Sequence, residues 1–312
     1  MNSLLMKQEI DKNITKTQFL EDLDCLFTNL KELYGMYDYF GDAKFKAAKQ
    51  AVEERLEQEF DFDTALAALK EELSFIKDGH FYIGEAVESA PIHGTINYTS
   101  YRGIPAIECK KFYYDSKEDE QQLITFAKSG EKYRDEKSLI LDFRGNRGGS
   151  SVYVWDFLEG LLGQEVGYSS KYLQRSTELY HDYLKMTHID WVPELHDTVE
   201  EEHCPRIKNE KRIYVLIDNL TASAAEEGVA VLKNIENVTI VGDHTAGRAS
   251  CGNCLPIYMP NSHFKAYFGT GLVLYEGDRN IDAEGGFFGD ISFETFEKML
   301  GKKTEAREGR GR

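Results

Sequence analysis

The feature that most constrains the fold is an alternation of short apolar segments with helical ones in the second half of the chain. Apolar runs of strand length occur at 138–142, 213–218 and 238–242, and segments with helical periodicity lie at 151–162 and 224–234. Buried strands that alternate with helices are typical of a mainly parallel sheet covered by helices. The sequence therefore predicts an α/β core.

The N-terminal part of the chain has helical periodicity instead. Thr15 and Gln18 stand in the spacing of a capping box, and apolar residues follow them at helical intervals. Two further helices are predicted at about 42–59 and 63–76, and Asp78 begins a turn that ends this region. We expect three parts, namely a small N-terminal helical domain at 1–85, an α/β domain at 86–300 and a charged, disordered tail at 301–312.

A polar insertion is expected inside the α/β domain, at about 167–210. It contains several tyrosines and four histidines, at positions 181, 188, 196 and 203. The spacing of these histidines does not match a compact set of ligands, so we expect no metal site there and no cofactor. An insertion between core elements is more typical of a lid or of a wall of a substrate site.

The five cysteines are scattered along the chain, which is unlike a disulfide framework. Cys251 and Cys254 have the spacing of a metal-binding pair, but no second Cys/His pair completes a set of four ligands. Zinc is therefore disfavoured. A local disulfide and two free thiols remain as alternatives for this pair.

The charge balance limits the partners that the chain would bind. Its formal net charge is −17, which disfavours nucleic acid and anionic membranes. No apolar run approaches the ~20 residues that span a bilayer, and the segment 1–10 is too polar for a signal peptide. As it stands the sequence indicates a cytoplasmic protein; an extracytoplasmic one, with a signal peptide removed before residue 1, is the alternative. A homo-oligomer is compatible with the sequence.

Ser223 stands between the apolar run 213–218 and the predicted helix 224–234. Serine is a preferred N-cap residue, so one interpretation is structural. The other interpretation is a nucleophile, because the free N–H groups at a helix N-terminus can stabilise an anion. The fragment alone does not decide between these two.

A glycine-rich loop, Asp142-Phe-Arg-Gly-Asn-Arg-Gly-Gly149, follows another predicted strand and opens a helix. Such a loop lets the backbone approach a ligand and direct N–H groups into a concavity. Its glycine spacing matches neither a dinucleotide-binding fingerprint nor a P-loop. A second donor to an oxyanion is a better use of these glycines than phosphate binding.

Three separated motifs resemble those of one family. They are Asp78-Gly-His80, the glycine-rich loop and Thr221-Ala-Ser-Ala-Ala-Glu226, followed by Val241-Gly-Asp-His-Thr-Ala-Gly247. The chain is similar to the C-terminal processing (tail-specific) serine peptidases, in the branch that includes the tricorn core. This resemblance implies a crotonase/ClpP-like core of ββα units and hydrolysis of peptide bonds.

The resemblance also implies which residues act. Ser223 matches the nucleophile of the family, and the N–H groups of Ala224 and of a Gly148/Gly149 peptide match its oxyanion hole. One branch of the family has a lysine base where this chain has Arg248.

Arg248 cannot be the base, because a guanidinium stays protonated and cannot accept the serine proton. His80 matches the histidine of the tricorn-like branch and suits the role of general base. Arg248 could instead neutralise a carboxylate of the substrate.

A histidine base needs an acceptor that orients it. The segment 281–290 resembles a late segment of the family that supplies a glutamate, and Glu284 is its match here. The segment is shorter than usual and has Gly289 where proline is expected, so Asp282 remains a rival. Asp78 is expected to shape the turn before His80.

The chain departs from the family in one respect. Tail-specific members usually carry a PDZ domain, but the segment between His80 and Asp142 is too short for one and is predicted to belong to the core. We therefore predict a compact serine-type endopeptidase that acts on peptides or unfolded segments. Two alternatives stay open because fold does not fix function: a non-catalytic protein that binds a small ligand, and a hydrolase of another acyl substrate.

Overall fold

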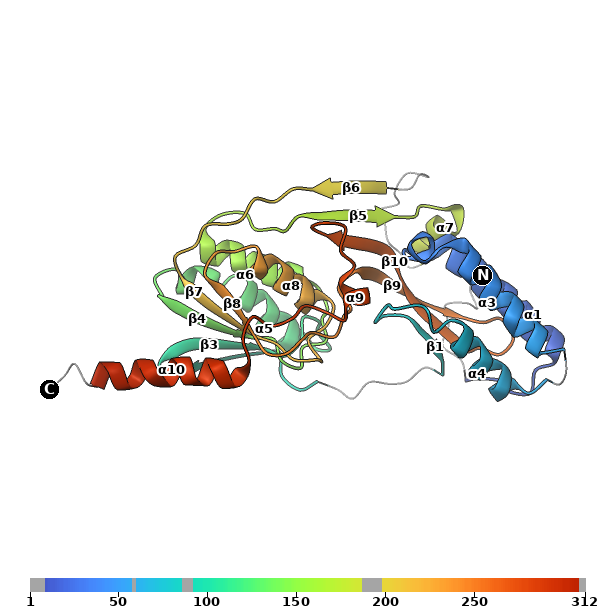
Figure 1. The fold of residues 1–312 in the computed structure, drawn as a ribbon, viewed down its shortest axis with the longest axis horizontal. Coiled ribbons are helices and arrows are strands. Elements are labelled where there is room, and N and C mark those ends of the chain that lie inside the picture. The colour runs from blue at the N-terminus through green and yellow to red at the C-terminus, as the bar shows by residue number, and fades with distance from the viewer. Residues whose placement is uncertain (1–8, 58–59, 86–91, 187–197, 309–312) are drawn as a thin grey trace. The chain divides into compact units, whose positions relative to one another are not determined.

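The computed structural model describes residues 9–57, 60–85, 92–186 and 198–308 (Figure 1). The chain divides into two compact units, each assembled from separated segments. The first unit consists of Met1–Ser89, Lys171–Glu201 and Ser250–Leu274. The second consists of Ala90–Ser170, Glu202–Ala249 and Tyr275–Arg312.

The second unit contains the α/β core that the apolar alternation predicts. Its sheet has the order β2-β3-β4-β7-β8, with β2 and β3 antiparallel and the remaining neighbours parallel. The strands are β2 Ile96–Tyr101, β3 Ile104–Cys109, β4 Ser138–Asp142, β7 Arg212–Leu216 and β8 Val238–Val241. Because Asp142 and Leu216 are partners in adjacent parallel strands, the loops after β4 and β7 leave the same edge of the sheet.

Helices pack against this sheet. The helices are α5 Lys117–Ala127, α6 Val152–Leu162, α8 Ala224–Lys233, α9 Ile281–Glu284 and α10 Phe293–Glu308, with a 3-10 turn at Gly130–Tyr133. Helix α6 contacts both α5 and α8. Phe296 of α10 packs against Tyr214 of β7, with ring centroids 5.0 Å apart. Helix α10 therefore packs on β4 and β7, the two strands that lead into the glycine-rich loop and toward Ser223.

The first unit joins helices to a second sheet. Its strands are β1 Tyr82–Gly84, β5 Ser170–Gln174, β6 Thr198–Glu202, β9 Cys251–Tyr258 and β10 Lys265–Tyr275, in the order β1-β10-β5-β6 with β9 paired to β10. Its helices are α1 Lys16–Leu33, α2 Tyr37–Phe40, α3 Asp42–Arg55, α4 Phe62–Glu72 and α7 Glu178–Met186. The predicted capping box is present at the start of α1, where Thr15 and Gln18 bond reciprocally. One buried cluster joins α1, α3 and α4 to β9 and β10.

The division into two units differs from the expected N-terminal helical domain that ends near residue 85. The helices at 16–72 bury their apolar faces against strands from 250–274, so they do not form a domain by themselves. The expected insertion contains β5, α7 and β6, and all but its ends belongs to the first unit. His188 and His196 lie outside the described residues.

The C-terminal segment also differs from the expectation of a disordered tail at 301–312. Helix α10 continues to Glu308, because this stretch consists largely of good helix formers. Residues 309–312 lie outside the description. All five cysteines are free thiols, and Cys251 and Cys254 lie in β9, which pairs with β10 in one constant register. None of the helices in the described part of the chain is long and apolar enough to cross a bilayer.

Candidate active site

Ser223 occupies a strained turn at the start of α8. Its φ is 55° and its ψ is −125°, a backbone conformation that residues other than glycine rarely adopt. Its N–H donates to Glu226 Oε2 at 3.0 Å. Strained backbone of this kind is found mainly at functional sites, where the surrounding structure holds it in place. Ser223 thus combines the position of an N-cap with a strained backbone.

The glycine-rich loop lies directly against this turn. Gly148 has φ +97°, and a Cβ built there would lie 2.6 Å from Ser223 Cβ and 3.1 Å from Ala224 N. Gly149 has φ +134°, and a Cβ there would lie 2.2 Å from the carbonyl carbon of Phe112. Glycine is therefore required at both positions, because neighbouring atoms leave no space for a Cβ and because the φ angles are positive.

Asn146 connects the loop to the turn at Ser223 and was not singled out from the sequence. Its side chain is fully buried, its Nδ2 donates to the Cys109 carbonyl at 3.0 Å, and its Oδ1 accepts from the Gly148 N–H at 2.9 Å. Its carbonyl accepts from the Ala222 N–H at 2.8 Å. The Gly148 N–H is therefore already bonded. Within the described residues no acceptor is found for the N–H groups of Gly149 and Ala224.

Glu226 is the second residue that the sequence reading did not single out. It is fully buried, and its carboxylate accepts from Ser223 N, Thr245 Oγ1, Gly247 N and Arg248 N at 2.5–3.0 Å. Burial raises the pKa of Glu226 above its ordinary value, although these hydrogen bonds act in the opposite direction. Its place at the third position of the helix, after a serine cap, was a signal that could have identified it.

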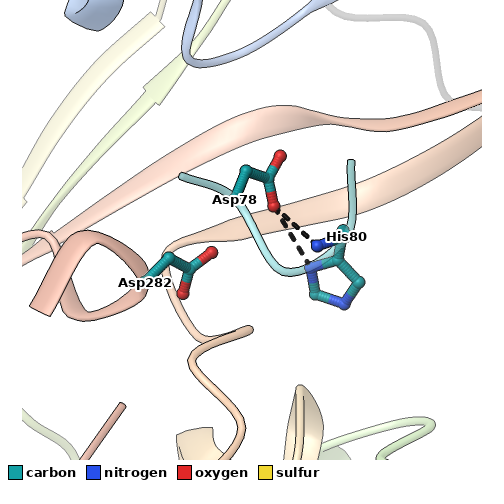
Figure 2. A group of neighbouring side chains, drawn as sticks. All are labelled: Asp78, His80 and Asp282. Atoms are coloured by element: carbon teal, nitrogen blue, oxygen red, sulfur yellow. Dashed lines mark hydrogen bonds and ion pairs between the residues drawn. The ribbon is translucent and has the colours of Figure 1, made fainter. Parts of the chain in front are cut away.

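His80 lies in the first unit, in the turn between α4 and β1. The buried Asp78 accepts from the His80 N–H at 2.8 Å and from the Tyr34 hydroxyl at 2.9 Å. Asp78 Oδ1 is 4.0 Å from His80 Nδ1, and Figure 2 marks both contacts between these two residues. Asp78 therefore shapes the turn, as expected, and also places a negative charge beside the imidazole.

The two late carboxylates have different surroundings within the second unit. Glu284 is paired with Arg279, whose Nε donates to Oε1 at 3.0 Å and to Oε2 at 3.2 Å, and its side chain is 37% exposed. Asp282 is buried, and its Oδ1 accepts from the Ala249 N–H at 2.6 Å. The carboxylate of Glu284 is thus occupied by a surface ion pair, whereas that of Asp282 is held in the interior.

The loop after β8 carries two further candidates. Arg248 is exposed, and its backbone N–H is the one held by Glu226. His244 Nδ1 lies 2.8 Å from the Thr245 carbonyl, and its ring packs 6.1 Å from that of Phe288. The guanidinium of Arg248 is therefore presented at the surface, and His244 is a loop residue, as expected.

Comparison with known proteins agrees with this geometry. The model of Peptidase family S41 matches residues 94–286, which is more than half of the chain. A solved structure from Parabacteroides merdae ATCC 43184, described as a candidate peptidase, is similar with a TM-score of 0.56 and 18% identity, over 89% of this chain and 91% of that one.

Two further structures are similar over nearly the whole chain. A serine-to-alanine variant of CPAF has a TM-score of 0.60 and 12% identity, over 89% of this chain and 93% of that one. The photosystem II D1 C-terminal processing protease has a TM-score of 0.50 and 10% identity, over 90% and 94%. At these identities the structural likeness establishes the fold, a mixed α/β fold with two sheets. The family match establishes more: this chain is a serine-type peptidase that belongs to peptidase family S41.

Proposed function

We propose that the chain is a serine endopeptidase in which Ser223 attacks the peptide carbonyl and His80 takes up its proton. The observation that carries this proposal is the strained backbone of Ser223, with φ 55°, in contact with a glycine that leaves no room for a side chain. Backbone strain costs free energy, about 1–3 kcal/mol for such a residue, and a plain helix cap does not need it.

The oxyanion hole that we propose consists of the N–H groups of Ala224 and Gly149. Ala224 is the first residue of α8, so its N–H has no acceptor within the helix. Gly148 is not assigned as a donor, because its N–H is bonded to Asn146 Oδ1. Each donor to the tetrahedral oxyanion would stabilise the transition state by about 3–4 kcal/mol.

His80 is proposed as the base because histidine titrates near neutrality, and because neither Arg248 nor Lys111 suits that role. Arg248 replaces the lysine of the other branch and cannot accept a proton. Lys111, next to the residue that contacts Gly149, is buried and bonded to Asp115 at 2.8 Å and Asp119 at 3.0 Å. A lysine held by two carboxylates retains its proton, so it is a poor base.

For the orienting carboxylate we propose Asp282 in place of Glu284. Asp282 belongs to the same late segment, is buried and is fixed by the Ala249 N–H. A fixed, buried acceptor can hold one imidazole tautomer, whereas a carboxylate paired with Arg279 would first have to break that pair. Asp78 would add to the negative charge that favours the imidazolium.

With these groups the reaction follows the usual course of serine hydrolases. Ser223 Oγ adds to the carbonyl, the amine leaves with the proton held by His80, and water then hydrolyses the acyl-enzyme. The substrates that we propose are peptides or unfolded segments, with Arg248 available to bind a carboxylate. The chain would carry this site on a crotonase/ClpP-like core without a PDZ domain.

The test is reaction with a fluorophosphonate, followed by mapping of the adduct by mass spectrometry. We expect one adduct, at Ser223, its absence from Ser223→Ala, and a rate at least about 100-fold lower in His80→Ala. Folded protein that gives no adduct at Ser223 would favour the alternative of a non-catalytic binding protein. An adduct without peptide hydrolysis would favour another acyl substrate.

Three matched substitutions identify the orienting carboxylate. We expect Asp282→Asn to lower kcat most, Asp78→Asn to lower it less, and Glu284→Gln to leave it nearly unchanged. Each keeps the size of the side chain and removes its charge, and circular dichroism checks that each variant is folded. A larger loss in Glu284→Gln than in Asp282→Asn would restore Glu284 as the acceptor.

A further inference from the structure

The carboxylate of Glu226 gathers donors from two separate segments of the second unit. Ser223 N–H belongs to the nucleophile turn, whereas Thr245, Gly247 and Arg248 belong to the loop after β8. We propose that Glu226 is a positioning residue, which fixes the backbone of the nucleophile and the loop that carries Arg248 as one rigid element. This proposal rests on the role of Ser223 proposed above.

The bonding pattern selects an ionised glutamate. Oε1 accepts from the Thr245 hydroxyl and the Gly247 N–H, and Oε2 accepts from the Ser223 and Arg248 N–H groups. Three of the four partners can only donate. A glutamine would turn its NH₂ group toward at least one of these N–H groups in either orientation, leaving buried donors unsatisfied. An aspartate is one methylene shorter and would not reach both segments.

The position of this carboxylate connects it to reactivity as well as to folding. By accepting the Ser223 N–H, it helps to hold the positive φ of that residue, and therefore the direction of its Oγ. A neighbouring link, from the Ala246 N–H to the Thr221 carbonyl at 2.8 Å, joins the same two segments. Because this second link remains when Glu226 is changed, the turn should loosen around Ser223 without unfolding of the core.

A merely structural carboxylate would lower the melting temperature and leave the reactivity of folded protein unchanged. A positioning role instead predicts slower reaction in folded protein, since a small displacement of a reacting group can cost about 100-fold in rate. The two roles are therefore separated by measuring the rate below the melting transition of every variant. A neutral fluorophosphonate is a suitable probe because it reports on Ser223 without requiring a known peptide substrate.

The experiment compares Glu226→Gln with Glu227→Gln, a change of the same kind at the next position of α8. We expect phosphonylation of Ser223 to be about 100-fold slower in Glu226→Gln and unchanged in the control. In ¹⁵N-labelled protein, the amide signals of Ser223, Gly247 and Arg248 should move together in Glu226→Gln. A wild-type rate in folded Glu226→Gln, or amide signals that do not move, would overturn the proposal.

A milder variant covers the case in which Glu226→Gln does not fold. Thr245→Val removes one donor and keeps the charge, so we expect a smaller loss of rate together with shifted Gly247 and Ser223 amide signals. Unchanged rate and signals in folded Thr245→Val would then overturn the proposal. If wild-type protein does not react at all, the role of Ser223 fails, while the amide signals still report whether Glu226 joins the two segments.

Discussion

The nucleophile turn and the His80 turn each present one proposed catalytic side chain, but they are held in different ways. In the second unit, Asn146 and Glu226 join the nucleophile turn to its neighbouring loops through buried hydrogen bonds. In the first unit, the His80 N–H is held by Asp78, which is in turn bonded to Tyr34. The nucleophile turn is thus bonded to two neighbouring loops, whereas the side-chain bonds described for the His80 turn converge on the carboxylate of Asp78.

The largest effect is expected where the second unit has no spare room. Gly148→Ala would place a methyl group 2.6 Å from Ser223 Cβ, so the nucleophile turn must shift. We expect Ser223 phosphonylation to fall by about 100-fold or more.

The matched control for this change is Gly145→Ala. Gly145 also has a positive φ, +76°, but a Cβ there meets nothing within 4 Å. Both variants should lose about 1–2 kcal/mol in the free energy of unfolding from the positive φ alone, which urea titrations measure. The difference between their rates of Ser223 phosphonylation then reports the steric clash at Gly148. Equal rates of Ser223 phosphonylation in the two variants would mean that the nucleophile turn can accommodate the added methyl group without displacing Ser223.

A smaller effect is expected in the first unit. Tyr34→Phe removes the hydroxyl that donates to Asp78 at 2.9 Å in a buried position. We expect a loss of about 1–2 kcal/mol in the free energy of unfolding, and a lower kcat because Asp78 holds the His80 turn less firmly. Tyr37→Phe is the control, since its hydroxyl donates to Asp42 instead, also at 2.9 Å. If both variants keep the wild-type kcat, the histidine turn is fixed by its packing and does not depend on this bond.

The same comparison explains which parts of the fold could be predicted from the sequence. Strand β4 was predicted with its bounds, because Leu139, Ile140 and Leu141 are all buried and polar residues bound the run. Strands β9 and β10 were missed: β9 has no regular alternation of buried and exposed residues, and it contains Gly252 and Asn253, which are residue types depleted in strands. Their pairing with α1, α3 and α4 in one core depends on contacts between residues far apart in the sequence, which no local pattern contains.

The candidate site shows the same limit. Ser223, His80 and the glycines could be proposed from motifs, because their chemistry depends on residue type. The sequence favoured Glu284 and kept Asp282 as a rival, since two carboxylates two positions apart differ only in partners that the sequence does not show. Asn146 was overlooked because its role lies in hydrogen bonds to Cys109 and Gly148, which become visible only when the loop is folded.

The smallest effect concerns the support beneath the glycine-rich loop, and it appears in acid. The Phe112 N–H donates to the Gly148 carbonyl at 2.9 Å, and the adjacent Lys111 is bonded to Asp119. Hydrogen bonds from Thr95 and then Lys111 lower the pKa of Asp119 from its ordinary value to about 2. A carboxylate with a lowered pKa in the folded state contributes stability above the pKa of the unfolded chain, near 4, and this contribution is lost as the pH falls toward 2.

Asp119→Asn should therefore lower the melting temperature at pH 7, and the difference from wild type should shrink as the pH falls from about 4 to 2. Asp115→Asn is the control: Asp115 contacts the same ammonium, at 2.8 Å, but its side chain is 63% exposed, so its effect should be smaller at every pH. A difference between Asp119→Asn and wild type that stays constant over this range would show that Asp119 acts through its packing. In that case Lys111 and Asp119 would support the glycine-rich loop through their packing, beside the hydrogen bond from the Phe112 N–H to the Gly148 carbonyl.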